Sequence, residues 1–329
     1  MAETSNISQI AELVSRDIFG VFNWERSCNT NCNWKCTTPE KHHCTTHPSD
    51  TVWFYDEPYS NQRTYIQSDL KSYAAKSITP AALSTALVNL SKATECAKKS
   101  APWQKKFMVD PGKPFSVVGM LFVYNHDGEY DKEFDALFTD PAFNRTLPLS
   151  KTPRVIVFGP KQIWELFSIA SHIKQLNYLE GKMVLSEPFY PECRRSQFRL
   201  RSFQSKAAAT IDYLLADVLS FRVKPVDYPG GYKSLHVYYR GRGDTMEEFL
   251  HLIDYCFRYQ QIDNAEEIVI HFSNIDATDR DALFENFERA RHEIKEAYRL
   301  SSEKLGSISC ESLSFSRPGF CSTEIGMRD

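Results

Sequence analysis

The sequence has no apolar run long enough to cross a membrane as a helix, which takes about 20 residues, and no marked excess of charge of either sign. Its 39 basic and 42 acidic residues give a net charge of −3. The chain therefore lacks the global positive field that attracts nucleic acid to many proteins. Any nucleic-acid site must be a local basic groove, or its acidic groups must be neutralised by a bound metal.

The first 20 residues also lack the basic start and apolar core of a secretory signal peptide. They are instead typical of an amphipathic helix, and we expect the protein to stay in the cytoplasm. Disulfides are rare in that compartment, and nine cysteines are an odd number. The cysteines are therefore predicted to be free thiols or metal ligands and not a disulfide framework.

The chain is long enough, at 329 residues, for one large domain or two ordinary ones, and its 42% hydrophobic content supports a packed core. A change of composition near residues 145–153 predicts a boundary there. We expect an α/β domain over residues 1–148, with a mixed sheet flanked by helices, and a second α/β domain over residues 149–300. The pattern stops at Ser301, so residues 301–329 are predicted to be a flexible tail.

Apolar periodicity places the elements within these domains. One helix is expected to begin after Thr79, where a capping threonine precedes a proline suited to the first helical turn. Residues 25–47 are polar and without periodicity, and are predicted to be a loop. The expected helices are 6–20, 80–98, 161–176, 205–219, 246–260 and 279–299, and the expected strands are 50–56, 64–72, 116–125, 154–160, 234–241 and 266–274.

Charged residues interrupt the second strand of a predicted hairpin. If residues 50–56 and 64–72 pair about a turn between Tyr59 and Ser60, Asp50 lies opposite Asp69. Residues two apart on a strand share a face, so Lys71 lies beside Asp69. Two carboxylates at one point repel each other unless a cation lies between them. The pattern therefore favours a divalent metal held by carboxylate oxygens and water.

This arrangement resembles the restriction-endonuclease-like superfamily, known as PD-(D/E)xK nucleases. In that family a helix supplies a glutamate, an aspartate shortly after a proline opens the second strand, and the third strand carries Asp or Glu, any residue, then Lys. Here the helix offers Glu12, the segment HPSD supplies Asp50, and SDLKSY supplies Asp69 and Lys71. The resemblance covers roughly residues 6–145, including the helix and buried strand that follow the motif.

The resemblance implies metal-dependent hydrolysis of phosphodiester bonds. Asp50, Asp69 and the backbone carbonyl of Leu70 would hold Mg²⁺ or Mn²⁺, and Glu12 would assist directly or through water. Lys71 would orient the attacking water or stabilise the charge of the transition state. Further residues are predicted to contact nucleic acid, either because they lie near this motif or because basic and aromatic residues alternate there: Tyr73, Lys76, Arg194, Arg195 and Arg199.

The polar loop over residues 25–47 is rich in cysteine and histidine. Four thiols in a segment without a core of its own suggest a structural Zn²⁺, whose binding would order the loop. An iron–sulfur cluster and unligated cysteines are the alternatives, and three histidines nearby leave the ligand set open. The predicted ligands are Cys28, Cys32, Cys36 and Cys44.

The sequence thus predicts a nuclease, with DNA favoured over RNA and with a role in defence against foreign DNA suggested by analogy. One alternative is an inactive module of the same fold that binds nucleic acid or protein. Another is a metal-dependent phosphoesterase acting on small nucleotides. No catalytic motif is evident in the second half, which is predicted to serve in partner binding, sensing or dimerisation.

Overall fold

The computed structural model describes residues 2–145, 147, 153–178, 184–190, 207–225, 232–272, 280–299 and 301–318. The chain forms two compact units, Met1–Phe167 with Arg317–Asp329, and Ser168–Ser316. The division falls after Phe167 and not after residue 148. The reason is that strand β7 (Val155–Phe158), which we expected in the second domain, pairs in parallel with β6 (Phe115–Asn125) of the first.

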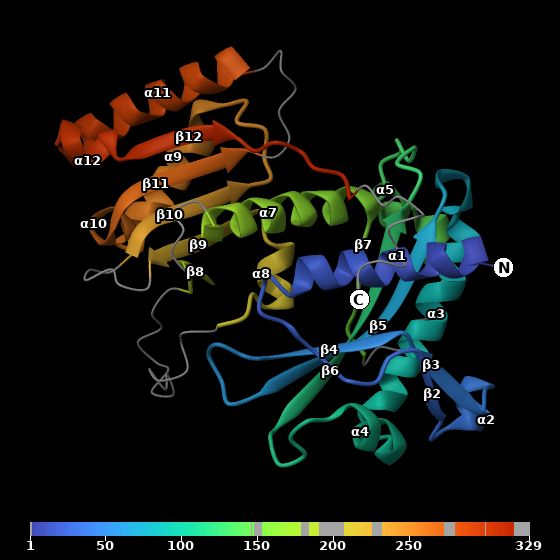
Figure 1. Ribbon diagram of the computed structural model, residues 1–329. Coiled ribbons are helices and arrows are strands. Elements are labelled where there is room, and N and C mark those ends of the chain that lie inside the picture. The colour runs from blue at the N-terminus through green and yellow to red at the C-terminus, as the bar shows by residue number, and fades with distance from the viewer. Residues whose placement is uncertain are drawn as a thin grey trace. The chain divides into compact units, whose positions relative to one another are not determined.

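The first unit contains a mixed five-stranded sheet in the order β1-β4-β5-β6-β7 (Figure 1). Strand β4 (Thr51–Asp56) pairs antiparallel with both β1 (Glu25–Arg26) and β5 (Arg63–Tyr73), whereas β5, β6 and β7 run parallel to one another. Thr51 pairs with Ser68. This pair belongs to the register predicted from the sequence, which is therefore confirmed.

Helices α1 (Ala2–Phe19) and α3 (Pro80–Ala97) cover opposite faces of this sheet (Figure 1). Phe19 of α1 contacts Phe122 of β6, with 5.9 Å between ring centroids. The leucines of α3 share a core cluster with Leu121 and Val123 of the same strand. Because successive strand residues point to opposite faces, the two helices lie on different sides. Asp69, in register with Leu121, faces the α3 side.

Helix α3 begins as predicted, because the Thr79 side chain accepts a hydrogen bond from the Ala82 amide and Pro80 occupies the first turn. A short helix, α4 (Ala101–Phe107), follows it and was not predicted. Smaller elements of this unit are the 3-10 helix Ala75–Ser77 and helices α5 (Ala136–Thr139) and α6 (Pro141–Arg145).

Residues 25–47 are not the irregular loop that we expected. Strands β2 (Cys32–Lys35) and β3 (Thr46–Ser49) form an antiparallel hairpin that encloses the short helix α2 (Pro39–His42). Trp34 and Cys36 are buried in one cluster with Trp103 and Phe107 of α4. The segment lacked a periodic signal because its strands are short and its core contacts come from a distant helix.

The second unit contains a five-stranded sheet in the order β12-β11-β10-β9-β8. Strands β10, β11 and β12 are mutually parallel, and β8 and β9 continue the sheet antiparallel. The bounds of its elements are β8 (Val184–Pro188), α8 (Ile211–Leu215), β9 (Val218–Pro225), β10 (Tyr232–Tyr239), α9 (Met246–Arg258), α10 (Gln261–Asn264), β11 (Ala265–Phe272), α11 (Arg280–Tyr298), α12 (Ser302–Gly306) and β12 (Ile308–Ser312).

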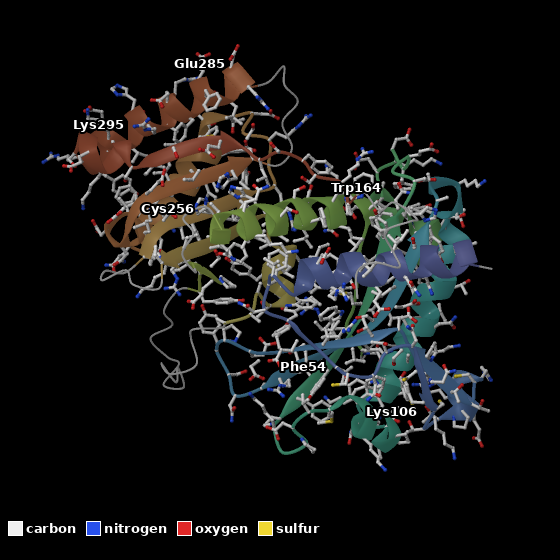
Figure 2. The ribbon with its side chains drawn as sticks, viewed as in Figure 1. Phe54, Lys106, Trp164, Cys256, Glu285 and Lys295 are labelled. Atoms are coloured by element: carbon white, nitrogen blue, oxygen red, sulfur yellow. The ribbon has the colours of Figure 1, made fainter. Side chains whose placement is uncertain are left out.

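Helices α9 and α11 pack on one face of this sheet, where Phe249 and Phe287 meet Val237 and Ile270 (Figure 1). Glu285 lies exposed on the outer side of α11 (Figure 2). Thr245 caps the start of α9, since its side chain accepts a hydrogen bond from the Glu248 amide. Among the helices in the described ranges, none combines the length and apolarity of a membrane span.

Two predictions for the second half are wrong. The helix expected over residues 205–219 is a single turn, α8, and the chain then enters β9, whose residues pair with both β8 and β10. The expected flexible tail begins instead with α12 and β12, and β12 pairs with β11. Further along, Arg317 packs over the Trp164 ring and donates to the Gly128 carbonyl.

Candidate active site and an adjoining cysteine–histidine cluster

A cavity of about 640 Å³ lies on the α3 face of the first sheet. One wall is helix α3, another is the end of β5, and the third runs from the end of α2 through β3 to Asp50. Its lining residues are His42, His43, Cys44, Thr46, His47, Pro48, Asp50, Gln67, Ser68, Asp69, Lys71, Tyr73, Ala82, Thr85, Ala86, Asn89, Leu90, Lys92 and Ala93. Asp50, Asp69 and Lys71, which the sequence singled out, are thus brought together in one cavity.

The two aspartates are held by different means. The Leu70 amide donates to Asp50 Oδ2 at 2.7 Å. Since the β4–β5 ladder ends at the pair Thr51–Ser68, the Asp50 carboxylate provides an acceptor for a backbone donor beyond that pair. The Lys71 ammonium lies 2.6 Å from Asp69 Oδ1. The three charged groups therefore occupy fixed places next to one another.

The electrostatics of these three groups favour an additional positive charge between the carboxylates. Burial and the neighbouring charge of Asp69 together raise the pKa of Asp50 to about 6. Although burial opposes its charged form, Lys71 has a raised pKa because Asp69 and Asp50 stabilise the ammonium. One ammonium therefore faces two carboxylates, and Asp50 stays destabilised as an anion. A divalent cation bound between the two carboxylates would remove that penalty.

A buried polar network fixes the segment just before Asp50. The Gln67 amide nitrogen donates to the Pro48 carbonyl at 3.0 Å, and its Oε1 accepts from the Ser49 hydroxyl at 2.8 Å and from Trp103 Nε1 at 2.9 Å. Trp34 Nε1 donates to the Ser49 hydroxyl at 2.8 Å. Sequence reasoning assigned Gln67 no such role, because its partners come from two elements distant in the sequence, β3 and α4.

Several predicted residues lie elsewhere. Glu12 is on α1, which covers the opposite face of the sheet, and its carboxylate pairs with Arg26 at 2.8 Å; it does not line the cavity. Tyr73 lines the cavity, whereas Lys76 is exposed outside it. For Leu70 the structure shows the amide contact, and the role of its carbonyl stays a prediction. The predicted nucleic-acid contacts Arg194, Arg195 and Arg199 lie outside the described residues.

Sequence reasoning missed the contribution of α3. Asn89 and Lys92 line the cavity from this helix and add a polar group and a positive charge, and the Lys92 charge acts on His42 and His47. A lysine on an amphipathic helix is usually a solvated surface residue, so only the fold identifies it. Asn89 and Lys92 could have been identified only from the packing of α3 beside β5.

Next to the cavity, four buried side chains gather with their ligand-type atoms within 4.8 Å of one another: Cys36, His42, His47 and Cys96. Cys36 Sγ lies 3.3 Å from His42 Nδ1, which lies 3.2 Å from His47 Nε2. The two sulfurs are 3.9 Å apart. A tetrahedral zinc with bonds of about 2.0–2.3 Å separates its ligand atoms by roughly 3.3–3.8 Å, so the group could hold a metal ion with little movement.

The surroundings of the group suit metal ligands. The amide and hydroxyl of Thr37 lie 3.1 and 3.0 Å from Cys96 Sγ, and the outer nitrogen of His42 faces Glu95 Oε2 at 3.7 Å. Burial lowers the pKa of His47 to about 4, so its ring is neutral and keeps a lone pair. Partners of this kind orient ligands and stabilise thiolates.

This cluster differs from the four thiols predicted from the sequence. Of these, only Cys36 belongs to it. Cys28 is exposed, and Cys32 is engaged with the Thr30 carbonyl. Cys44 lies beside the cluster, 3.7 Å from His47 Nδ1. Sequence reasoning missed Cys96, the member of the cluster that comes from α3. It lies 60 residues beyond Cys36, and two cysteines so far apart form no recognisable metal-binding motif.

A mixed sheet between two helices, with the aspartates and lysine at the end of its hairpin, defines a restriction-endonuclease-like nuclease domain. Residues 1–162 match the family described as the GAPS4 protein PD-(D/E)XK nuclease domain. This half of the chain therefore belongs to the PD-(D/E)XK nucleases, which act on nucleic acids. Comparison with curated proteins and with solved structures gave no match.

Proposed function

We propose that the first unit is a metal-dependent nuclease that hydrolyses phosphodiester bonds in DNA. The observation that carries the proposal is the convergence of Asp50, Asp69 and Lys71 in one cavity of a PD-(D/E)XK domain. Two acids and a base at this position provide both a cation site and a donor for a phosphate oxygen.

The residues present fit a divalent cation. Asp50 and Asp69 are close enough for mutual repulsion to raise the pKa of Asp50, and carboxylate oxygens are the ligands that Mg²⁺ and Mn²⁺ prefer. These two side chains would hold the ion. When bound, such an ion polarises the scissile phosphate and lowers the pKa of a coordinated water.

The protein's own groups complete the chemistry. Lys71 remains an ammonium because Asp69 lies 2.6 Å away, so it can donate to a phosphate oxygen whose negative charge grows in the transition state. The Leu70 amide fixes the orientation of Asp50, and Gln67 fixes the backbone before it. Lys92, on the facing wall, supplies a second positive charge for the phosphate backbone.

We extend the proposal to the setting: the enzyme would act in the cytoplasm on foreign DNA. This step rests on analogy with the family and on the predicted compartment. Cells that carry the wild-type chain should restrict incoming foreign DNA, and cells that carry Lys71→Ala should not. Equal restriction by both would remove the nuclease site from this role.

The decisive experiment is cleavage of plasmid and linear DNA by the purified full chain with Mg²⁺ or Mn²⁺. Wild type should cut, while Asp69→Ala and Lys71→Ala should lose cutting and keep their melting temperatures. Asp56→Asn is the matched control, because Asp56 lies on the same hairpin and pairs with Arg63 and Lys113 outside the cavity. It should cut at the wild-type rate.

Other outcomes would contradict the proposal. A folded wild type that binds DNA but cuts none with either metal would indicate a binding module. Cleavage of small nucleotides but not of long DNA would indicate a phosphoesterase. Cleavage of RNA in preference to DNA would keep the chemistry and change the substrate.

A further inference from the structure

The second unit contains a cluster of three histidines that plays no part in the nuclease site. His172 lies on α7 (Pro160–Tyr178), His236 on β10 and His271 on β11. One ring nitrogen of each lies within 4.8 Å of the others. His236 and His271 are nearly inaccessible to solvent, at 6% and 2% exposure, and His172 is half-buried.

The fold explains why the three side chains meet. On β10, Leu235 and Val237 face the core formed with α9 and α11, so His236 faces the opposite side of the sheet. Ile270 of β11 faces that same core, which sends His271 to the opposite side as well. Helix α7 presents His172 there, 4.7 Å from His271 between ring centroids.

The partners of the six ring nitrogens divide them into two sets. On the outer side, His172 Nδ1 lies 2.8 Å from the Tyr238 hydroxyl and His236 Nε2 lies 3.1 Å from the Ser234 hydroxyl. His271 Nδ1 lies 3.8 Å from Glu311 Oε2. Each histidine therefore has an oxygen beside one nitrogen. Histidines that bind metals usually donate this second N–H to such an oxygen.

On the inner side, His236 Nδ1 and His271 Nε2 approach each other at 2.9 Å. If the outer nitrogens carry the protons, these two have facing lone pairs, which repel unless a cation joins them. Both rings are almost completely shielded from water, at 6% and 2% exposure, so water cannot separate or solvate these two nitrogens.

We propose that His172, His236 and His271 bind one Zn²⁺ through His172 Nε2, His236 Nδ1 and His271 Nε2, with water as the fourth ligand. Neutral imidazoles are ligands that zinc accepts readily, and three of them with a water complete a tetrahedral site. The ion fastens the C-terminal part of α7 to β10 and β11. The site is separate from the cysteine–histidine cluster, which belongs to the first unit.

A rival arrangement is a hydrogen-bonded chain in which His236 and His271 share one proton between their inner nitrogens and no metal binds. That chain uses two histidines and gives the third no role. Convergence of all three rings, each with its own outer oxygen partner, favours the metal. The two arrangements differ in metal content and in the effect of changing His172, and both can be measured.

The test uses the full chain with Cys36→Ser and Cys96→Ser to remove the other cluster. Zinc content is measured by plasma mass spectrometry, and Co²⁺ substitution is followed by visible absorption. We expect one zinc per chain and a tetrahedral cobalt spectrum without sulfur-to-metal charge transfer. No zinc and no cobalt spectrum, in a protein whose circular dichroism shows a folded second unit, would overturn the proposal.

Single variants in this background locate the site. His172→Gln is chosen because His172 is the least buried of the three, and it should lose the bound zinc. Tyr238→Phe removes only the oxygen beside His172 Nδ1 and should weaken zinc binding about 10- to 100-fold. His251→Gln, on an exposed position of α9, is the matched control and should keep one zinc.

If His172→Gln is folded and retains a full equivalent of zinc, the assignment is wrong. If that variant fails to fold, zinc titration of the chelator-treated Cys36→Ser, Cys96→Ser protein decides the question. Saturation at one equivalent, with an increase in melting temperature that Tyr238→Phe reduces, supports the site. Absence of saturable binding rejects it. None of these readouts depends on DNA cleavage.

Discussion

The first unit contains two groups of candidate metal ligands that lie close together in the sequence. The two groups differ in burial and in the atoms that they offer to a metal. Asp50 and Asp69 line an open cavity and offer hard oxygen ligands. Cys36, His42, His47 and Cys96 are all buried and offer sulfur and nitrogen. His47 belongs to the closed cluster and lies three residues before Asp50 in the sequence.

If both groups bind metal, the difference in burial and ligand type suits two different roles for the two ions. Structural zinc sites are closed by four protein ligands, whereas catalytic metals keep positions for water and substrate. The cysteine–histidine cluster ties the β2–β3 hairpin to α3, and Gln67 ties the same hairpin to β5. On this interpretation the closed cysteine–histidine site stabilises the strands and helix that position the aspartates of the open site.

A variant that disables only the open aspartate site separates the two sites most clearly. In Asp50→Asn we expect cleavage to fall at least about 10³-fold, since a bound metal contributes several kcal/mol of charge stabilisation. Zinc content should stay unchanged, because Asp50 is not one of the four clustered ligands. Initial cleavage rates and metal analysis of the same preparation test this. Loss of zinc together with activity would show that the sites are one.

The converse variant is Cys96→Ser. Removing a buried ligand should release the zinc and lower the free energy of unfolding by at least about 3 kcal/mol, which is about 6–12 °C in melting temperature for a unit of this size. Cleavage should fall as a consequence of the loosened hairpin. Melting curves and zinc analysis provide the measurement.

Cys28→Ser is the control that makes this result specific. Cys28 was a predicted ligand, but its thiol is exposed and outside the cluster. Its replacement should leave zinc content and melting temperature as in wild type. Equal zinc loss in the two variants would restore the ligand set predicted from the sequence.

A smaller effect on activity is expected from Gln67, which connects the β2–β3 hairpin to the strand that carries Asp69. Gln67→Met removes the acceptor of Ser49 and Trp103 and leaves their buried donors unpaired, which should cost about 1–3 kcal/mol of stability. Because the segment before Asp50 loses its anchor, kcat should fall about 10-fold with KM little changed. Gln67→Glu keeps an acceptor for Ser49 and Trp103 but loses the donor to the Pro48 carbonyl, so it should not restore kcat. An unchanged kcat in Gln67→Met would show that the network is only structural.

The sequence predicted those elements of the first unit that depend on local patterns. The register that brings Asp50 to Asp69 follows from the turn and from strand alternation, and α3 follows from its cap and apolar stripe. Cys96 and Gln67 act through partners distant in the sequence, and no local pattern marks such contacts. The helix predicted over residues 205–219 extends into the start of β9. In the structure β9 pairs with β8 and β10, and this pairing outweighs the local helical preference.

The smallest expected effect concerns Lys92, which lies on α3 and lines the cavity. Its charge is available to a phosphate in the cavity, and neutralising one phosphate contributes about one counterion to the salt dependence of binding. Lys92→Ala should therefore weaken DNA binding a few-fold and reduce the slope of log affinity against log salt by about 1. Lys98→Ala, at the exposed end of the same helix, should leave the slope unchanged. Binding is measured in Ca²⁺, which commonly supports binding without cleavage, so that rate and affinity stay separate. Equal slopes for Lys92→Ala and wild type would mean that the phosphate backbone follows a path away from α3.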